Sequence, residues 1–543
     1  MPVSSQYPPV DIPNVDLWTF LFERKDRTFP DDNIIYQDAD TQRFYTYKTL
    51  KDAALAFGQG LKAVYDWRKG DVLALFTPNS IDTPVVMWGA HWAGGVVSPA
   101  NPAYTTEELA FQLKNSGAKA VITQVPQLSV VREAAKKVNI PEDRIILIGD
   151  KRDPEARFKH FTSIRNISGA TRYRKTKINP DKDLSFLVYS SGTTGVPKGV
   201  RLSHRNIVAN SLQLAAGEAG HLTWNGGADG KGDRVLAFLP FFHIYGLTCL
   251  VHQTLYQGYK LVVMERFDIE KWCAHVQNYR ITFSYVVPPV VLLLSKHPVV
   301  DKYDLSSLRM MNSGAAPLTH ELVEAVYARI KCALGGMAHK HRIGRKMLPN
   351  MEAKYMTMPE DGSEPREVSA GEVGELYMKG PNVFQGYHNN PAATAECLTD
   401  GWFRTGDVGY QDKNGNFYIT DRVKELIKYK GFQVAPAELE GILVDHEAID
   451  DVAVIGIESE AHGTEVPLAY VVRSAKSKSS GASAEQEAAN IIEWLDGKVA
   501  YHKRLRGGVR FVDAIPKSVS GKILRRVLKK QAKEEAAAPK AKL

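Results

Sequence analysis

Short, apolar, β-prone runs alternate with a longer helical pattern in the early part of the chain. DVLALF at 71–76, KAVITQ at 119–124 and RIILIG at 144–149 are rich in strand-forming residues, and YTTEELAFQLKNSG at 104–117 has the spacing of a helix. Strands that alternate with helices are typical of βαβ units, in which neighbouring strands are parallel. The pattern predicts an α/β fold built on a parallel sheet.

The character of the sequence changes after Gly406. DKNGNFYI places Asn414 and Gly415 between two β-prone runs, as a tight hairpin turn requires. Residues 421–512 then mix short strands with two helical stretches, one beginning around Pro436 and one over 485–499. Because 543 residues exceed what one hydrophobic core usually organises, a second, small α+β domain is expected here.

Composition narrows the functional classes. With 44% hydrophobic and 24% charged residues the chain is an ordinary globular protein. The net charge of +8 is mild for this length, and no basic block is interleaved with aromatic residues, so no nucleic-acid partner is expected. The most apolar segments start at Val85 and Ser284, but His91, Pro288 and Pro289 interrupt them. No membrane span is therefore expected.

The termini and the cysteines bear on location. The amino terminus lacks the basic start and apolar run of a signal peptide. The carboxyl terminus, Ala541, Lys542 and Leu543, is close to the Ser-Lys-Leu peroxisomal address and predicts recognition by the peroxisomal import receptor, with the cytoplasm as the alternative. Reduced thiols with no metal-binding spacing are expected at Cys249, Cys273, Cys332 and Cys397.

The most informative motif is YSSGTTGVPKGV, residues 189–200, which follows the strand-like run LSFLV. Its small residues leave backbone N–H groups free to surround phosphate oxygens, and Lys198 adds a positive charge. Pro197 and Gly199 stand where a Walker A loop needs a glycine and a serine or threonine. A flexible surface turn is the alternative, which the lysine and the length of the match disfavour. The motif predicts phosphate binding.

This motif resembles the phosphate loop of the adenylate-forming superfamily, which contains acyl- and aryl-CoA ligases, firefly luciferases and peptide-synthetase adenylation domains. Further segments resemble motifs of that superfamily and occur in its order. They are LPFFHIYGL around His243, NSGAAPL from Asn312, GWFRTGDVGY from Gly401, DRVKELIKYKGFQVAPAELE from Asp421 and PKSVSGKILRR from Pro516. The ordered set is far more specific than any single motif.

The resemblance implies a domain organisation. A large, multilayer α/β adenylation domain would span residues 1–422, and a small, mobile α+β domain would span 423–531, with the hinge at Lys424. Residues 532–543 would form a flexible tail, because they are charged and rich in alanine.

The resemblance also implies an ATP site. Asp407 would accept hydrogen bonds from the ribose hydroxyls, because a carboxylate is an acceptor-only group, and Arg422 would contact the same sugar. Without the resemblance, Asp407 would be interpreted as a turn residue. The residues that would hold the β and γ phosphates are Ser190, Ser191, Gly192, Thr193, Thr194, Gly195 and Lys198.

Catalysis would centre on Lys522, together with Lys198 and His243. The Lys522 ammonium would bridge the substrate carboxylate and the α-phosphate, countering the charge that builds as one anion attacks another. A surface lysine is the alternative. After rotation of the small domain, the strand carrying Lys428, Gly431 and Gln433 would help to form the tunnel for CoA.

The substrate acid would bind near His243 and Tyr245, which otherwise would be core residues. Gly314, Ala315 and Ala316 are small, so adenine and the acyl group could approach the backbone there; turn packing is the alternative. This lining is apolar. It suits an aromatic or aliphatic acid.

One stretch departs from the resemblance. Where the superfamily has a Tyr-Gly-x-Thr-Glu segment, whose glutamate supports Mg²⁺, this chain has GGMAHKHRIGRKMLPNMEAKYM from Gly335. A short internal piece is missing there, near Gly336. Its basic cluster at 339–346 is interpreted as solvated surface, and no protein metal site is expected, because histidines alternating with lysine make a poor cage.

The sequence as a whole predicts an acid:CoA ligase of the 4-coumarate, phenylacetate or medium-chain acyl type. ATP, Mg²⁺ and CoA would be required, and the reaction would run through an acyl-adenylate with release of pyrophosphate and AMP. Two alternatives stay open: a catalytically impaired or inactive nucleotide-binding homologue, because of the missing segment, and an adenylation or luciferase-like enzyme of the same fold.

Overall fold

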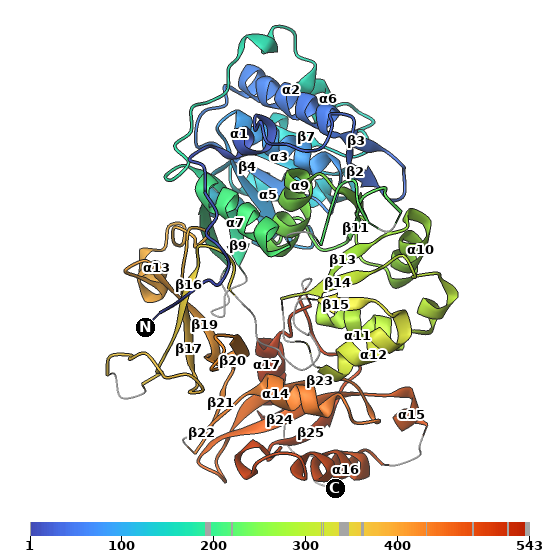
Figure 1. The fold of residues 1–543 in the computed structure, drawn as a ribbon, viewed down its shortest axis with the longest axis vertical. Coiled ribbons are helices and arrows are strands. Elements are labelled where there is room, and N and C mark those ends of the chain that lie inside the picture. The colour runs from blue at the N-terminus through green and yellow to red at the C-terminus, as the bar shows by residue number, and fades with distance from the viewer. Residues whose placement is uncertain are drawn as a thin grey trace.

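The computed structural model describes most of the chain, which folds into a large and a small body joined near residue 423 (Figure 1). The described residues are 2–190, 197–218, 221–227, 229–315, 318, 320–335, 347–359, 363–430, 432–479, 483–518 and 521–537. No helix among them is long and apolar enough to cross a membrane.

The first sheet confirms the predicted α/β architecture. Its strands are parallel except for the antiparallel pair of β9 and β10, and the three predicted runs form β4, β6 and β7. In spatial order the strands are β10 (Lys198–Ser203), β9 (Leu184–Ser190), β5 (Val96–Ala100), β4 (Val72–Phe76), β6 (Ala118–Thr123), β7 (Ile145–Leu147) and β8 (Lys159–His160).

Both faces of this sheet are buried, which explains its uninterrupted apolar runs. In β4, Leu73 and Leu75 point into one hydrophobic cluster, while Val72, Ala74 and Phe76 point into another on the opposite face. The second cluster is covered by α4 (Thr106–Ser116) and α5 (Leu128–Lys137). A strand that lies between two buried layers carries apolar side chains on both of its faces.

The second sheet has the same mixed character. Its parallel strands are bordered by the antiparallel pair of β2 and β3. In spatial order they are β15 (Ala333–Gly335), β14 (Met310–Ser313), β13 (Phe283–Val286), β11 (Arg234–Ala237), β12 (Lys260–Val263), β2 (Ile34–Asp38) and β3 (Phe44–Thr46). The two most apolar segments are a helix-to-strand junction and a strand-to-helix junction, as predicted, because Val85 lies in α3 (Asp82–Trp92) and Ser284 in β13.

The helices of the large body begin and end where local chemistry dictates. The predicted helix at 104–117 is α4, which starts at a capping box of Thr105 and Glu108 and ends at Gly117 with φ of 68°. The remaining helices of this body are α1 (Leu17–Phe22), α2 (Tyr47–Tyr65), α6 (Phe161–Arg165), α7 (His204–Gly217), α8 (Ile244–Gly246), η4 (Leu247–His252, a π-helix), α9 (Gln253–Gln257), α10 (Ile269–Tyr279), α11 (Pro288–Lys296), α12 (His320–Ile330) and α13 (Pro391–Cys397).

Helices α2 and α3 pack backbone against backbone. A Cβ added at Gly58 would lie 2.5 Å from the Gly89 carbonyl oxygen, and one added at Gly89 would lie 2.7 Å from the Ala54 carbonyl oxygen. No side chain fits at either position, so glycine is required for this close approach.

A third, antiparallel sheet links the two bodies. It contains β1 (Val3–Ser4), β16 (Glu352–Met356), β17 (Gly374–Lys379), β19 (Trp402–Gln411) and β18 (Leu398–Thr399), with β20 (Phe417–Arg422) beside β19. The predicted hairpin joins β19 and β20, and Gly415 has the positive φ of 78° that such a turn needs. The loop between the two strands is longer than a two-residue turn. Within it, the Asp412 side chain accepts hydrogen bonds from the backbone N–H groups of Asn414 and Asn416.

The small body is the predicted α+β domain, with both expected helices. It contains β21 (Ile427–Tyr429), β22 (Phe432–Val434), α14 (Pro436–Leu443), β23 (Ile449–Ser459), β24 (Thr464–Arg473), α15 (Ala475–Lys478), α16 (Ala484–Asp496), β25 (Gly508–Phe511) and α17 (Arg525–Ala537). Its core clusters draw only on residues from 427 onward.

The carboxyl-terminal helix extends further than the sequence indicates. Residues 532–537, which were expected to belong to a flexible tail, are helical, and Ala532 is buried against β23 and β24. Leu528, one turn earlier, points into the same cluster. Residues 538–543, with Ala541, Lys542 and Leu543, lie outside the described residues.

Candidate active site

The phosphate loop leaves the first sheet at the end of β9 and returns at the start of β10, directly after a strand as predicted. Ser190 and Lys198 face each other across this exit, and the Ser190 hydroxyl donates to the Lys198 carbonyl oxygen at 3.4 Å. The Lys198 ammonium lies 5.2 Å from the centre of the Tyr387 ring, within range of a cation–π contact. Outside the described residues lie the predicted phosphate ligands Ser191, Gly192, Thr193, Thr194 and Gly195.

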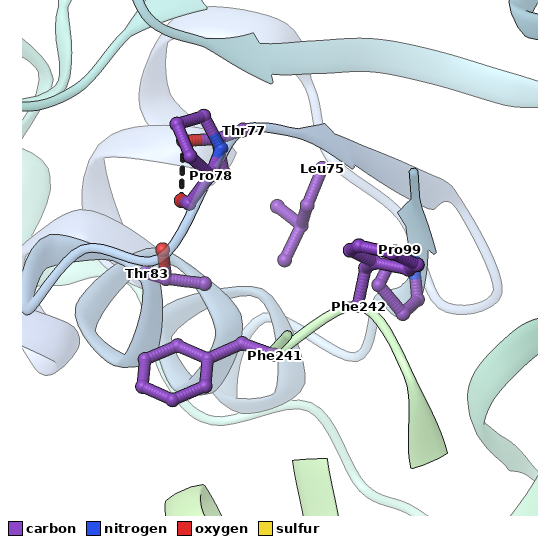
Figure 2. Close-up of a pocket in the computed structure, with 7 residues that line it drawn as sticks. All are labelled: Leu75, Thr77, Pro78, Thr83, Pro99, Phe241 and Phe242. Atoms are coloured by element: carbon purple, nitrogen blue, oxygen red, sulfur yellow. Dashed lines mark hydrogen bonds between the residues drawn. The ribbon is translucent and has the colours of Figure 1, made fainter. Parts of the chain in front are cut away.

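Asn79 fixes the backbone that leads to His243. Its side-chain nitrogen donates to the Leu239 carbonyl at 3.0 Å, and its side-chain oxygen accepts from the Phe241 N–H at 2.9 Å. Figure 2 shows Phe241 and Phe242 against the ends of β4 and β5, around a gap of about 10 Å³. That gap holds at most about one water molecule, so it is a packing feature of the support and not a substrate site.

His243 caps the short helix α8. Its Nδ1 accepts from the Tyr245 N–H at 3.2 Å, and burial lowers its pKa. A neutral imidazole whose Nδ1 is an acceptor carries its proton on Nε2. His243 is therefore a fixed, uncharged hydrogen-bond donor at Nε2.

Tyr245 connects this segment to the carboxyl end of β14. Its hydroxyl donates to the Asn312 carbonyl at 3.1 Å, and a Cβ added at Gly314 would lie 3.0 Å from its ring. Ala315 follows with φ of 71°, a left-handed conformation that an L-residue adopts at a cost of about 1 kcal/mol or more. The predicted small residues thus allow close approach to Tyr245, while Ala316 lies outside the described residues.

Asp407 and Arg422, the predicted ribose contacts, form an ion pair with each other. They are register partners on β19 and β20, with Arg422 Nε 3.0 Å from Asp407 Oδ1. Burial raises the pKa of Asp407, and the charges of Arg422 and Lys522 oppose that rise. The structure therefore brings Lys522 into the same charged group, although it lies about a hundred residues later in the sequence.

Lys522 lies in a closed turn at the interface of the two bodies. The Ser518 N–H donates to the Lys522 carbonyl at 2.8 Å, and Gly521 has φ of 79°. A Cβ added at Gly521 would lie 3.0 Å from Pro289 and 3.3 Å from Val287, at the junction of β13 and α11. Burial lowers the pKa of Lys522, and nearby Arg422 adds to the effect. The turn docks on the large body and presents Lys522 to the site.

A network of ion pairs that was not predicted from the sequence holds this lysine. Glu425 Oε1 lies 3.9 Å from Lys522 Nζ, and Glu425 Oε2 lies 2.6 Å from Arg525. Arg525 also pairs with Glu440 at 2.7 Å and donates to the Val454 carbonyl at 3.1 Å. Glu425 and Arg525 stand inside the matched motifs, which was the only signal that could have identified them.

Asp421 ties the large body to helix α14 of the small one. Its Oδ2 accepts from the Ala437 N–H at 3.0 Å, in the first turn of that helix. Asp421 is 4% exposed, and burial raises its pKa. A carboxylate at a helix amino terminus satisfies a free N–H group and complements the helix dipole.

The predicted CoA-tunnel residues are not part of this cluster. Lys428 and Gln433 pair across the β21–β22 hairpin, at the outer edge of the small body, and both are exposed (Figure 1). Gly431, between them, lies outside the described residues. Lys424, the predicted hinge, is exposed in the turn after β20.

Residues 336–346, within the stretch that departs from the resemblance, also lie outside the described residues. Within the part of the chain that is described, no three histidine, cysteine or acidic side chains are grouped so that they could hold a metal ion. None of the four cysteines is in a disulfide, and Cys249, Cys273 and Cys332 are buried.

Two family models match most of this chain. Residues 22–388 match the model described as AMP-binding enzyme, and residues 438–522 match the AMP-binding enzyme C-terminal domain. The second match lies wholly within the small body.

Individual relatives match over nearly the whole length. The chain is 35% identical to probable 4-coumarate–CoA ligase 1 of Dictyostelium discoideum, with 97% of each chain covered. It is 36% identical to 4-coumarate–CoA ligase of Vanilla planifolia, with 97% of this chain and 95% of that protein covered. Among solved structures, ATP-bound MatB from Rhodopseudomonas palustris matches with a TM-score of 0.81 at 27% identity, covering 96% of this chain and 99% of that one.

Proposed function

This chain belongs to the AMP-binding enzyme family and is an acid–CoA ligase, and on that premise we propose that its substrate is an aryl acid or a medium-chain acid of similar width. Its reaction is the ATP-dependent formation of an acyl-CoA through an acyl-adenylate. The inactive homologue that the missing segment suggested is not favoured, because the curated relatives that match nearly the whole chain are CoA ligases.

The grouping of Lys522 with Asp407 and Arg422 at the interface of the two bodies supports the adenylation half of this proposal most strongly. Asp407 and Arg422 would hold the ribose. Lys522 would stabilise the attack of a carboxylate oxygen on the α-phosphorus as the bond to pyrophosphate breaks. Lys198 and the phosphate loop would hold the β and γ phosphates.

The second half-reaction requires a different arrangement. The CoA thiolate would attack the acyl carbon and displace AMP, after a rotation about Lys424 that carries Lys522 away and brings Lys428 and Gln433 to the site. Their exposed position on the β21–β22 hairpin agrees with a role that begins only after the rotation. The domain boundary would then fall between residues 422 and 423.

Mg²⁺ would enter bound to ATP. The described residues offer no ready-made cage for it, and Mg²⁺ is usually held by one or two carboxylates together with substrate phosphates. The ion would neutralise phosphate charge, while Lys198 and Lys522 do the positioning that falls to this chain.

An acid panel tests the proposal. The full chain, with ATP, Mg²⁺ and each of a series of cinnamic, benzoic and straight-chain acids, should catalyse acid-dependent ATP–pyrophosphate exchange. Addition of CoA should yield the thioester and AMP. Silence toward every acid, with ATP still bound, would contradict the assignment of these substrates.

We also propose a peroxisomal location, on the basis of Ala541, Lys542 and Leu543. The full chain with a fluorescent protein at its amino terminus should enter peroxisomes, and the same fusion without the last three residues should stay outside. A diffuse signal from both fusions would reject this address.

A further inference from the structure

A half-buried carboxyl group, Glu218, lies behind the predicted acid-binding residues. The ring of Tyr245 meets the ring of Tyr285 edge-on, with 5.9 Å between the centres. The Tyr285 hydroxyl in turn donates to Glu218 Oε1. Glu218 follows the last residue of α7, and the residue types around it gave no sequence signal.

A continuous series of contacts runs from Lys522 to this carboxyl group. The Lys522 turn packs on Val287, and the preceding residue, Val286, accepts from the Gly314 N–H at 3.2 Å. Gly314 contacts Tyr245, which leads through Tyr285 to Glu218. An acid whose carboxylate meets Lys522 and whose chain passes Tyr245 therefore points its far end toward Glu218.

The surroundings of Glu218 are polar but uncharged. Gln257 donates to its Oε2 at 3.3 Å. Among the described residues no lysine or arginine forms an ion pair with Glu218, and the buried hydroxyls of Tyr259 and Thr254 lie close together nearby. Burial raises the pKa of Tyr259, and the Glu218 charge adds to it, which places the two groups close together.

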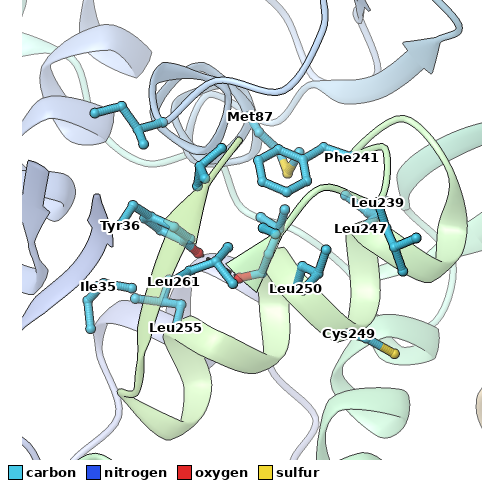
Figure 3. Packing of buried hydrophobic residues seen from close by; sticks show 14 of the residues in the cluster. Ile35, Tyr36, Met87, Leu239, Phe241, Leu247, Cys249, Leu250, Leu255 and Leu261 are labelled. Carbon is cyan, nitrogen blue, oxygen red and sulfur yellow. Dashed lines mark hydrogen bonds between the residues drawn. The ribbon is translucent and has the colours of Figure 1, made fainter. Parts of the chain in front are cut away.

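The π-helix η4 lies on another side of Glu218. Burial and the Glu218 charge raise the pKa of Cys249 to about 12, so this thiol is uncharged. Figure 3 shows Cys249 with Leu250 and Leu255 among the buried residues of one cluster. A π-helix turn is wider than an α-helical one, and such turns often mark functional sites.

A carboxyl group whose surroundings are polar but uncharged is costly to bury. Removing a carboxylate from water without a cation costs several kcal/mol, and burial accordingly raises the pKa of Glu218 to about 7. Tyr285, Gln253 and Gln257 hydrogen-bond to Glu218 and use three of its roughly four acceptor positions, which leaves one for another donor.

We propose that Glu218 is a specificity-determining residue, which receives a hydrogen-bond donor, such as a phenolic or terminal hydroxyl, at the end of the substrate acid remote from its carboxylate. This inference rests on the proposed function. It narrows the substrate class to acids that carry a distal donor.

Matched acids with and without the donor test the inference. Values of kcat/KM are measured for 4-coumarate against cinnamate, and for an ω-hydroxy fatty acid against its parent, in the full chain. The unaltered protein should prefer the hydroxylated acid of the pair that it accepts. Because the carboxyl oxygen is the proposed acceptor, Glu218→Gln should lower that preference about tenfold, and Glu218→Leu should abolish it.

Two further variants separate recognition from a structural role. Tyr285→Phe removes the internal partner of Glu218 but leaves the carboxyl group, so the preference should persist. Glu487→Gln, at a buried carboxyl group of the small body that binds Ser477, should leave the preference unchanged.

The outcomes are distinct. An active protein whose preference is the same in both Glu218 variants would overturn the inference and leave the proposed function intact. Equal loss of the preference in Tyr285→Phe and Glu218→Gln would also overturn it, because the pair would then act only by shaping the pocket. Inactivity of the unaltered protein toward every acid would overturn both.

Discussion

The two halves of the site hold their polar groups in opposite ways. On the small-body side, Lys522, Arg525 and their carboxylate partners form a network of ion pairs. On the large-body side, Tyr245, Tyr285 and Glu218 form a chain of contacts in which the described residues include no ion pair. All members of the ion-pair network belong to the small body, so the network can move with that body as one unit, whereas packed rings and neutral hydrogen bonds hold the surface of the large body in shape.

The same contrast separates catalysis from recognition. In the proposed function, the charged half would act on phosphate, and its action would depend on how the two bodies dock. The half with Tyr245, Tyr285 and Glu218 would select the acid, and its selectivity would depend on packing within one body. Substitutions in the first half should change one half-reaction, and substitutions in the second should change substrate preference or stability.

The largest effect is expected from Lys522→Ala. Adenylate formation should fall about a hundredfold or more, because the variant lacks the cation that meets the developing charge. Thioester formation from a supplied acyl-adenylate should be nearly unaffected. ATP–pyrophosphate exchange and thioester release are the two measurements. Lys517→Ala is the matched control, because Lys517 lies in the same loop as Lys522 but forms its ion pair with Asp451. Equal losses in both half-reactions would refute the role given to Lys522.

A smaller effect is expected from Asp421→Ala. The variant loses the hydrogen bond to α14 that crosses between the bodies, and a lost cap costs about 1 kcal/mol, so adenylate formation should fall about fivefold. Thioester formation should not fall with it. Ser483→Ala removes an equivalent cap on α16 inside the small body and should lower only the melting temperature. If both variants slowed adenylate formation relative to thioester formation by a similar factor, the comparison between the two halves of the site would fail.

The third prediction concerns the stability of the large body and not its reaction. Burial lowers the pKa of His204 and of His252 to about 4, and it lowers that of His91 as well. Because the unfolded chain binds these protons near pH 6.5, the stability is fully present above that pH and is lost as the pH falls toward 4. Each histidine contributes about 1.4 kcal/mol per pH unit in that window.

Denaturant unfolding between pH 7.5 and 5 measures this dependence. His252→Gln should reduce the slope of stability against pH relative to the unaltered protein. His502→Gln, at a histidine of the small body that stacks on exposed Phe432, should leave the slope as it is. An unchanged slope in His252→Gln would show that this histidine is already charged in the folded state.

Much of the fold could be predicted from local patterns. The runs that became β4, β6 and β7 are short and apolar, and α4 carries its own capping box and terminal glycine, so these elements depend mainly on nearby residues. The tail was less predictable, because the helix that continues past residue 532 is stabilised by Ala532 packing on a distant sheet.

The site residues divide in the same way, into those that local motifs identify and those that they do not. Ser190, Lys198, Asp407 and Lys522 lie within motifs and could be named from the sequence. Glu218 acquires its surroundings only from residues far along the chain, such as Tyr285. The identity of one residue and of its sequence neighbours does not show which distant residue will contact it.

The sequence by itself determined the order of the elements, the phosphate loop and the family's reactive lysine, because each depends on residues that are close together in the chain. Only the tertiary structure decided that the Lys522 turn rests on Val287 and Pro289, and that a half-buried glutamate lies behind Tyr245. The physical reason is that burial and electrostatic coupling depend on distances in space, and folding brings these groups together from separate parts of the chain.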